Sequence, residues 1–188
     1  MKLLYQYARQ GNIKKIQELL AAGLVDPWFE EGNENAVYKA IANRKTDAAR
    51  LLLDAMDDIN VPDKSGNTAL MYAARFGDVK IVEYLLGRGA KVNVSSSVGS
   101  TPLSNAAAEG FANIVEMLIK RGAKVDTPNM FGVTALQQAV IGNDVDVIKV
   151  LIKAGANPHI KNRHGEDAFD IAKTYNRKVA KLMGGTEE

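Results

Sequence analysis

The stretch that decides the fold is GSTPLSNAA at residues 99–107, because it recurs at one fixed spacing. Residues 66–74 read GNTALMYAA and residues 132–140 read GVTALQQAV, so the period is about 33 residues in both directions. Weaker copies lie in register at 165–172 (GEDAFDIA), 33–40 (NENAVYKA) and 3–8 (LLYQYA). A fixed period of this length is typical of repeat proteins. The sequence therefore predicts six copies, at about 1–32, 33–65, 66–98, 99–131, 132–164 and 165–183, and a disordered tail at 184–188.

Each copy contains the signals for two short helices. Thr101 followed by Pro102 is typical of a helix cap and the first helical residue, and Thr68, Asn35 and Asp167 are candidate caps at equivalent positions. The side-chain oxygen of such a residue accepts a hydrogen bond from a free N–H of the first turn. We expect a first helix to begin directly after each of these residues.

The first helix is expected to end where the chain takes a positive φ. Gly77 and Gly110 suit that position, Asn143 is a tolerable substitute and Arg44 is an exception. A second helix follows, as at 79–86, with a wide apolar stripe. Turn residues then separate one copy from the next, which predicts a hairpin-like loop that projects from the helix pair.

A single copy cannot bury its own apolar faces, whereas stacked copies share one continuous core. The second copy has Ala48 and Ala49 where other copies have larger residues, so we expect a thinner core there. The outer faces of the terminal copies carry Lys15, Lys173 and Lys181 at otherwise apolar positions, which favours a complete array. Small residues at one position would let the first helices approach closely, namely Ala40, Ala73, Ala106, Ala139 and Ala172.

This pattern resembles the ankyrin repeat over essentially the whole chain. The resemblance is carried by Thr-Pro-Leu-x-x-Ala-Ala at 101–107, the glycine that ends the first helix, Ile-Val-x-x-Leu at 81–85 and Gly-Ala-Lys-Val-Asn at 89–93. The family's usual His after Leu is absent from every copy. The resemblance implies an all-α, ankyrin-type solenoid of six helix-turn-helix repeats of about 33 residues with projecting hairpin loops, forming a single domain over 1–183.

Composition narrows the possible functions. Lys and Arg number 24 against 22 Asp and Glu, so the formal charge is only +2, which argues against a nucleic-acid-binding protein. Cysteine is absent, which excludes disulfides and thiolate metal sites. No signal sequence or membrane-spanning run is recognised, so we expect a cytoplasmic monomer that does not bind membranes.

No motif in the sequence indicates a catalytic or metal-binding site. The two histidines, His159 and His164, lie in or beside the last loop, and only Glu166 and Asp167 are near them as further metal ligands. Solvent-exposed loop residues are the simpler interpretation. We therefore expect no cofactor and no enzymatic activity. A metal-dependent enzyme or small-ligand protein using the loop around His159–Asp167 stays an alternative, as does a passive structural spacer.

The family resemblance implies instead a non-catalytic module that binds a partner protein or peptide segment in a concave groove, formed by the loop tips and the first helices. Large apolar residues at such positions favour binding, because contiguous exposed apolar side chains tend to mark interaction sites. The acidic residues near 30–34 and the more basic far end suggest a charge gradient that orients the partner. The expected contact residues are Glu30, Glu31, Tyr38, Lys64, Met71, Arg75, Phe76, Glu109, Met130, Phe131, Ile141 and Arg163.

Overall fold

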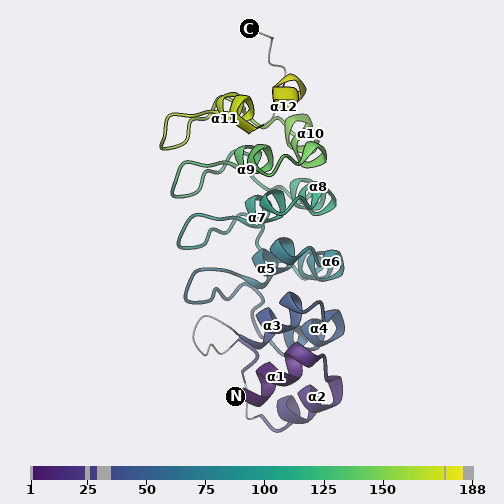
Figure 1. Ribbon diagram of the computed structural model, residues 1–188. Helices are drawn as coiled ribbons and strands as arrows, with labels where there is room; N and C mark the ends of the chain where they lie inside the picture. Colours follow the sequence, from purple (N-terminus) through teal and green to yellow (C-terminus); the bar gives the residue numbers. More distant parts are fainter. Residues whose placement is uncertain (1, 24–25, 29–34, 176, 184–188) are drawn as a thin grey trace. The chain divides into compact units, whose positions relative to one another are not determined.

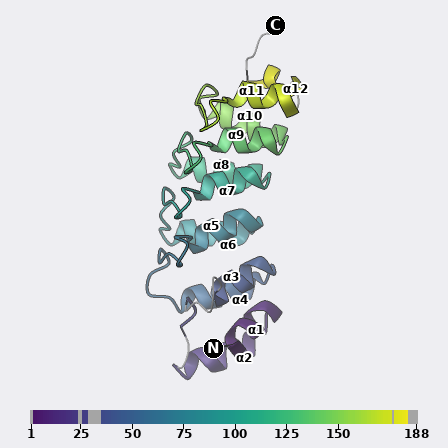
Figure 2. The same cartoon turned by 60° about the vertical axis from the view of Figure 1, so that its left-hand side comes forward.

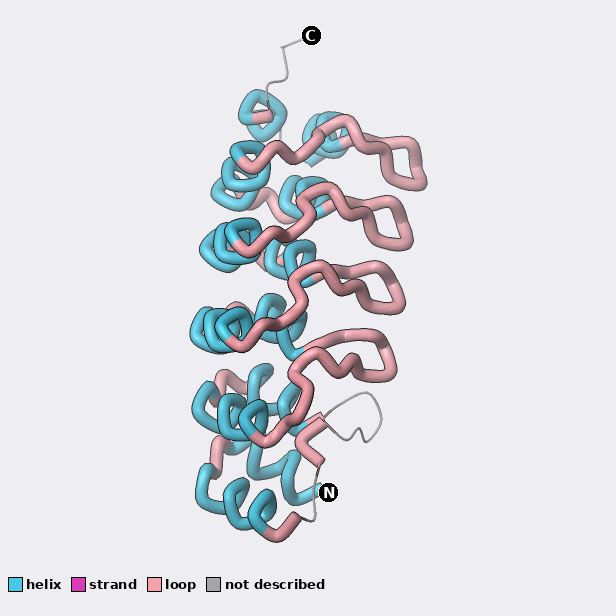
Figure 3. The backbone as a smooth tube through the Cα atoms, turned by 180° about the vertical axis from the view of Figure 1, so that it is seen from behind, coloured by secondary structure: helices cyan, strands magenta, loops and turns pink. Residues whose placement is uncertain are grey.

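The computed structural model describes residues 2–23, 26–28, 35–175 and 177–183. The chain divides into two compact units, residues 1–91 and 92–188. Within the described residues all regular secondary structure is helical (Figure 3), which confirms the all-α class. The single domain over 1–183 stays a prediction, and the tail at 184–188 lies outside the described residues.

The first unit contains three helix pairs. These are α1 (Lys2–Gln10) with α2 (Ile13–Ala21), α3 (Ala36–Ala42) with α4 (Thr46–Asp54), and α5 (Ala69–Phe76) with α6 (Val79–Gly87). Helices α1, α3 and α5 pack on one another as one layer, and α2, α4 and α6 form the second (Figure 1). Each copy is therefore one rung of a two-layered stack, as the repeat predicts.

The second unit repeats this arrangement. Its pairs are α7 (Pro102–Ala108) with α8 (Ala112–Lys120), α9 (Ala135–Ile141) with α10 (Val145–Lys153), and α11 (Ala168–Tyr175) with α12 (Arg177–Leu182). The loops before α7, α9 and α11 project from the layer of first helices on the side away from the second helices (Figures 1 and 2). First helices and loop tips thus share one side of the unit.

Small side chains let the first helices pack closely, as expected. The alanines at the repeated position, Ala40 and Ala73 in the first unit and Ala106, Ala139 and Ala172 in the second, are all fully buried. The lysines expected on the terminal copies, Lys15, Lys173 and Lys181, are exposed. The apolar stripe of the second helices supplies the rest of the interior, so most of the core is aliphatic.

The ends of the first helices follow the backbone conformation that the sequence predicts. Gly77 and Gly110 have φ values of 71° and 78°. Asn143 and Arg44 take the same left-handed conformation, each with φ of 56°. Glycine adopts this region freely, whereas an arginine is strained in it. The left-handed turn therefore forms in this copy even though arginine disfavours a positive φ.

Most of the predicted helix caps are confirmed. Asn35, Thr101 and Asp167 each accept a hydrogen bond from the amide three residues further on, and Pro102 is the first residue of α7. Thr68 is the exception: its backbone is extended as a cap requires, but its hydroxyl is buried without a hydrogen-bond partner. The prediction of a side-chain cap at Thr68 is therefore wrong.

Polar side chains also join successive copies at the base of the loops. In the first unit the Asn60 side chain accepts a hydrogen bond from the Lys91 backbone N–H, at 2.7 Å. In the second unit Asn93 and Asp126 accept from backbone amides of the following copy in the same way, at 2.8 and 3.0 Å. These three residues recur at the period of the repeat, so the copies are linked by directional bonds as well as by apolar packing.

Candidate functional site

A polar side chain organises each loop tip that the structure describes. In the first unit the Asp63 carboxylate accepts hydrogen bonds from the Ser65 and Asn67 amides, at 2.9 and 2.8 Å, and from the Tyr72 hydroxyl. Burial, followed by this hydrogen bond to Asp63, raises the pKa of the Tyr72 phenol. The loop is therefore held by its own side chains.

The second unit builds its tips by the same means. Ser96, Asn129 and Asn162 occupy the position of Asp63 in the successive copies. The Asn129 side chain accepts from the Phe131 and Val133 amides, at 2.9 and 3.0 Å, and the Asn162 side chain accepts from amides two and four residues on. Tips fixed in this way lose little further entropy on binding.

Neighbouring tips of the second unit are in direct contact. The Met130 amide donates to the Val98 carbonyl and the Arg163 amide donates to the Phe131 carbonyl, both at 2.9 Å. A Cβ atom on Gly99 would lie 2.9 Å from backbone atoms of the next loop, so this position requires glycine. The three tips thus form one continuous ridge.

Large apolar side chains stand exposed on the tips and on α9 of the second unit. Phe131 is 54% exposed, Ile141 47%, Val98 44% and Met130 43%. Ile141 is the last residue of α9, on the layer of first helices, and the other three lie on the tips. Phe131 therefore does not fold under its own loop. The expected contact residues Glu109 and Arg163 are exposed on the same unit.

In the first unit the expected contact residues are divided. Lys64 and Arg75 are exposed. Tyr38 and Phe76 are half-buried, with ring centroids 5.7 Å apart, and the Tyr38 ring also lies 4.8 Å from that of Tyr72. These rings link α3 to α5, so part of their surface serves packing rather than binding. Glu30 and Glu31 lie outside the described residues.

Met71 was expected on the partner surface because it stands where the family's His would be, but its side chain is fully buried. The position is the third of the first helix, where a polar side chain can bond back to the amide of the cap. Ser104 and Gln137 do so in later copies, at 2.9 Å each, while being almost completely buried. Met71 is therefore not available to a partner, and its position serves the helix start.

A capping-box pattern was the signal in the sequence that identifies this role. Thr134 and Gln137 have the Thr-x-x-Gln spacing, and each bonds to the backbone of the other. The Gln137 amide also donates to the carbonyls of Ile160 and Glu166 in the next loop, at 2.8 and 3.1 Å. This one side chain thus ties α9 to the base of the last tip.

The loop that holds the two histidines offers little for catalysis. His159 Nδ1 lies 3.5 Å from the Asp167 carboxylate and its ring lies 5.2 Å from that of Phe169. Asp167 also caps α11, so its carboxylate is already engaged by backbone amides. Among the residues that the structure describes, no three His, Asp or Glu side chains gather as a metal site would need.

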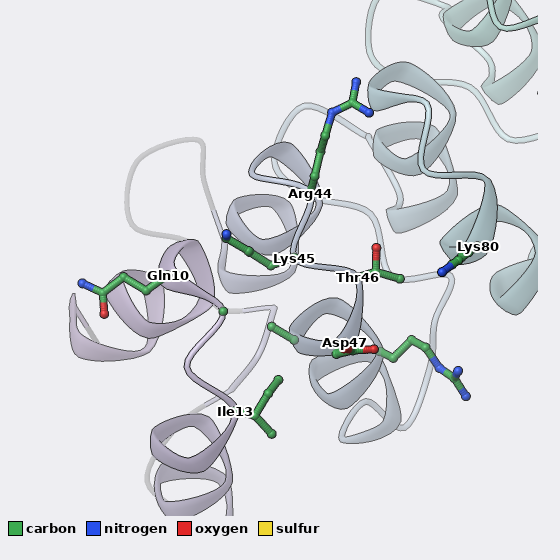
Figure 4. A pocket seen from close by; sticks show the side chains of 10 residues that line it. Gln10, Ile13, Arg44, Lys45, Thr46, Asp47 and Lys80 are labelled. Atoms are coloured by element: carbon green, nitrogen blue, oxygen red, sulfur yellow. The ribbon is translucent and has the colours of Figure 1, made fainter.

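A surface hollow of about 500 Å³ lies in the first unit, where the first helices turn into the second (Figure 4). Its lining includes the cations Arg44, Lys45, Arg50 and Lys80. Arg44 and Lys45 extend away from Thr46 in different directions (Figure 4), and the Arg50 guanidinium lies 4.9 Å from the Tyr84 ring centroid. The cations do not converge on one point, so the hollow lacks the geometry of an anion site.

One residue that lines this hollow is smaller than its counterparts in later copies. Ala48 contributes to its lining, whereas the equivalent residues of later copies are the larger Ile81, Ile114 and Val147. All of these side chains are buried. The thinner core expected for the second copy stays a prediction.

Comparison with known protein families decides which group of repeat proteins this is. A family model described as ankyrin repeats (3 copies) matches residues 4–96 and again residues 89–162. The chain belongs to the ankyrin repeat family. Ankyrin repeats are generally protein–protein interaction modules and are typically not enzymes.

One relative of this ankyrin repeat chain is Cortactin-binding protein 2 of Rattus norvegicus. The two are 41% identical over 69 residues, which is 36% of this chain and 4% of the rat protein. The ankyrin repeat chain thus spans only a small part of that relative's length. In the part of the chain that the structure describes, no helix has both the length and the apolar character needed to cross a bilayer.

Proposed function

We propose that this chain is a non-catalytic binding module that holds a partner protein, or an extended segment of one, between its loop tips and its first helices. The observation that carries the proposal is the group of exposed apolar side chains on that side of the second unit, led by Phe131 and Ile141 at 54% and 47%. Exposed apolar side chains on a rigid backbone lose unfavourable hydration when a partner covers them. Binding there needs no rearrangement of the fold.

A protein suits this surface better than a nucleic acid. Two of the three tips of the second unit lack cations: the loops at 92–100 and 125–133 carry a single ionisable side chain, Asp126, which accepts a backbone hydrogen bond. Lys161 and Arg163 are confined to the third tip. Nucleic-acid sites depend on clustered Lys and Arg that contact phosphates. We further propose that the chain acts as a cytoplasmic monomer, without membrane, cofactor or metal.

We propose that the first unit carries contact residues of its own, which are more polar. Lys64 and Arg75 are exposed there, and the rings of Tyr38 and Phe76 are half-buried. Arginine and aromatic side chains are common anchors in protein interfaces. On the second unit, Glu109, Met130 and Arg163 are further contact residues that we propose.

The test compares cross-linking of two double variants in extracts of cells that express the chain. Phe131→Ala with Ile141→Ala removes exposed apolar surface from the proposed site. Leu3→Ala is the control, since Leu3 is also 52% exposed but lies on α1 of the first unit and does not belong to the apolar group of the second unit that is under test. Leu3→Ala is combined with Val61→Ala, a second exposed apolar residue of the first unit.

We expect proteins that cross-link to the wild-type chain to be lost with the first variant and kept with the control. Urea unfolding of both variants should match the wild type, because exposed side chains contribute little to stability. Equal capture by all three proteins would contradict the proposed site. An absence of any specific cross-link would favour a passive spacer instead.

A further inference from the structure

The three contacting tips of the second unit differ in the polarity and charge of their side chains, and the tips follow one another in a fixed order. Because the copies recur at a constant period, Ser97, Met130 and Arg163 hold the same place on successive tips, and Val98, Phe131 and His164 hold the next place. The backbone bonds from Met130 to Val98 and from Arg163 to Phe131 keep this order rigid. The ridge therefore changes from neutral and polar, through apolar, to cationic.

The apolar part is the tip patch, which we define as Val98, Met130 and Phe131. All three side chains are at least 43% exposed, and they come from adjacent tips. No charged side chain stands among them, since residues 95–100 and 127–133 contain none. An apolar side chain of a partner can therefore cover the tip patch without burying a charge.

The cationic part lies on the tip next to Phe131. Arg163 and Lys161 are both exposed there, and neither forms an ion pair with any carboxylate of the described residues. The one acid on this tip, Glu166, accepts a hydrogen bond from the Asn162 side chain at 3.1 Å. The Arg163 guanidinium thus has its donors available, and its fork of N–H groups matches the two oxygens of a carboxylate.

We infer that the partner segment carries an apolar side chain for the tip patch and, a short distance along, an Asp or Glu carboxylate for Arg163. This inference rests on the proposed function and adds the chemistry of the partner. The apolar contact supplies most of the attraction, and the charge sets the direction in which the segment lies across the tips. A segment with a cation at that place is rejected by like charge.

The probe is a phage-displayed library of random peptides, selected on the full chain and counter-selected on a variant with Met130→Ser and Phe131→Ser. We expect the enriched peptides to share an apolar residue and an acidic residue at a constant separation. One such peptide, made synthetically, should bind about tenfold more weakly to Arg163→Glu. Replacing its acidic residue by Lys should restore binding to Arg163→Glu.

Lys149→Glu is the matched control, because Lys149 is an exposed cation on α10 and the change in net charge is identical. Enriched peptides without a shared acid, or equal weakening by Arg163→Glu and Lys149→Glu, would overturn the inference. So would a library from which no peptide depends on the tip patch, or self-association of the chain that Phe131→Ser abolishes. If one of these results is found but binding of the peptides still requires Phe131 and Ile141, the inference fails and the proposed function stands. If peptide binding requires neither Phe131 nor Ile141, the proposed function is refuted as well.

Discussion

Gln137 offers the sharpest test of how the copies are joined. Its side chain is 1% exposed and makes three hydrogen bonds to backbone, from the Thr134 amide at 2.9 Å and to the carbonyls of Ile160 and Glu166 at 2.8 and 3.1 Å. The test change is Gln137→Met, because the equivalent residue of the third copy is Met71, which is fully buried. A methionine therefore fits the shape of this position.

The expected loss follows from the groups that the change leaves without partners. The Glu166 carbonyl keeps its bond from the Asn162 amide, at 2.9 Å. The Thr134 N–H loses its acceptor, the Gln137 side-chain oxygen, and the Ile160 carbonyl loses the bond that the Gln137 side-chain amide donates. An unsatisfied buried backbone group costs about 1–3 kcal/mol. We expect the free energy of unfolding to fall by about 3 kcal/mol, which lowers the melting temperature by about 6–12 °C in a chain of this size.

Gln138→Met is the matched control at the neighbouring residue. The carbonyl oxygen of the Gln138 side chain is buried and has no hydrogen-bond partner, so replacing it should be neutral or slightly stabilising. Urea unfolding followed by circular dichroism measures both variants, and hydrogen exchange should rise at 158–166 with Gln137→Met alone. Equal losses in the two variants would refute the reasoning, as would a Gln137→Met protein as stable as the wild type.

Two further predictions concern the backbone and pH. Arg44→Gly should raise the free energy of unfolding by about 0.5–1 kcal/mol by relieving a φ of 56°, while Arg44→Ala should not; a loss with glycine in urea unfolding contradicts this. Because the pKa of Tyr72 is raised in the folded chain, the unfolded chain ionises first, so stability should fall as pH rises above about 10. Tyr72→Phe should flatten that fall in alkaline urea titrations, and an unchanged slope would count against it.

The two-helix copy and its turns were predictable because they depend on local rules. The fixed repeat spacing, the caps at Asn35 and Thr101 and the left-handed turn at Gly77 all follow from residues close in sequence. The same rules failed at Thr68, whose hydroxyl makes no cap bond.

The candidate site was predictable only in part. The sequence placed Met130, Phe131 and Ile141 at the tips and first helices, and their exposure agrees with this placement. It also placed Met71 there, although that side chain is buried. Exposure depends on how neighbouring copies cover a position, and a periodic pattern does not distinguish a covered position from an open one.

The sequence by itself determined the unit of the fold, because each helix start, helix end and apolar stripe is specified within one copy. The tertiary structure decided the contacts between copies. These are the hydrogen bonds that Asn60, Asn93 and Asp126 accept from the following copy, and the bond from the Gln137 side chain to the next loop. The contacts between tips also set the order of polar, apolar and cationic side chains along them. These contacts join residues that lie far apart in the chain. Which groups pair depends on the distance and angle between them, and the stacking of the copies sets both. A hydrogen bond forms only at a suitable distance and angle between donor and acceptor, and the spacing of residue types along the chain predicts neither quantity.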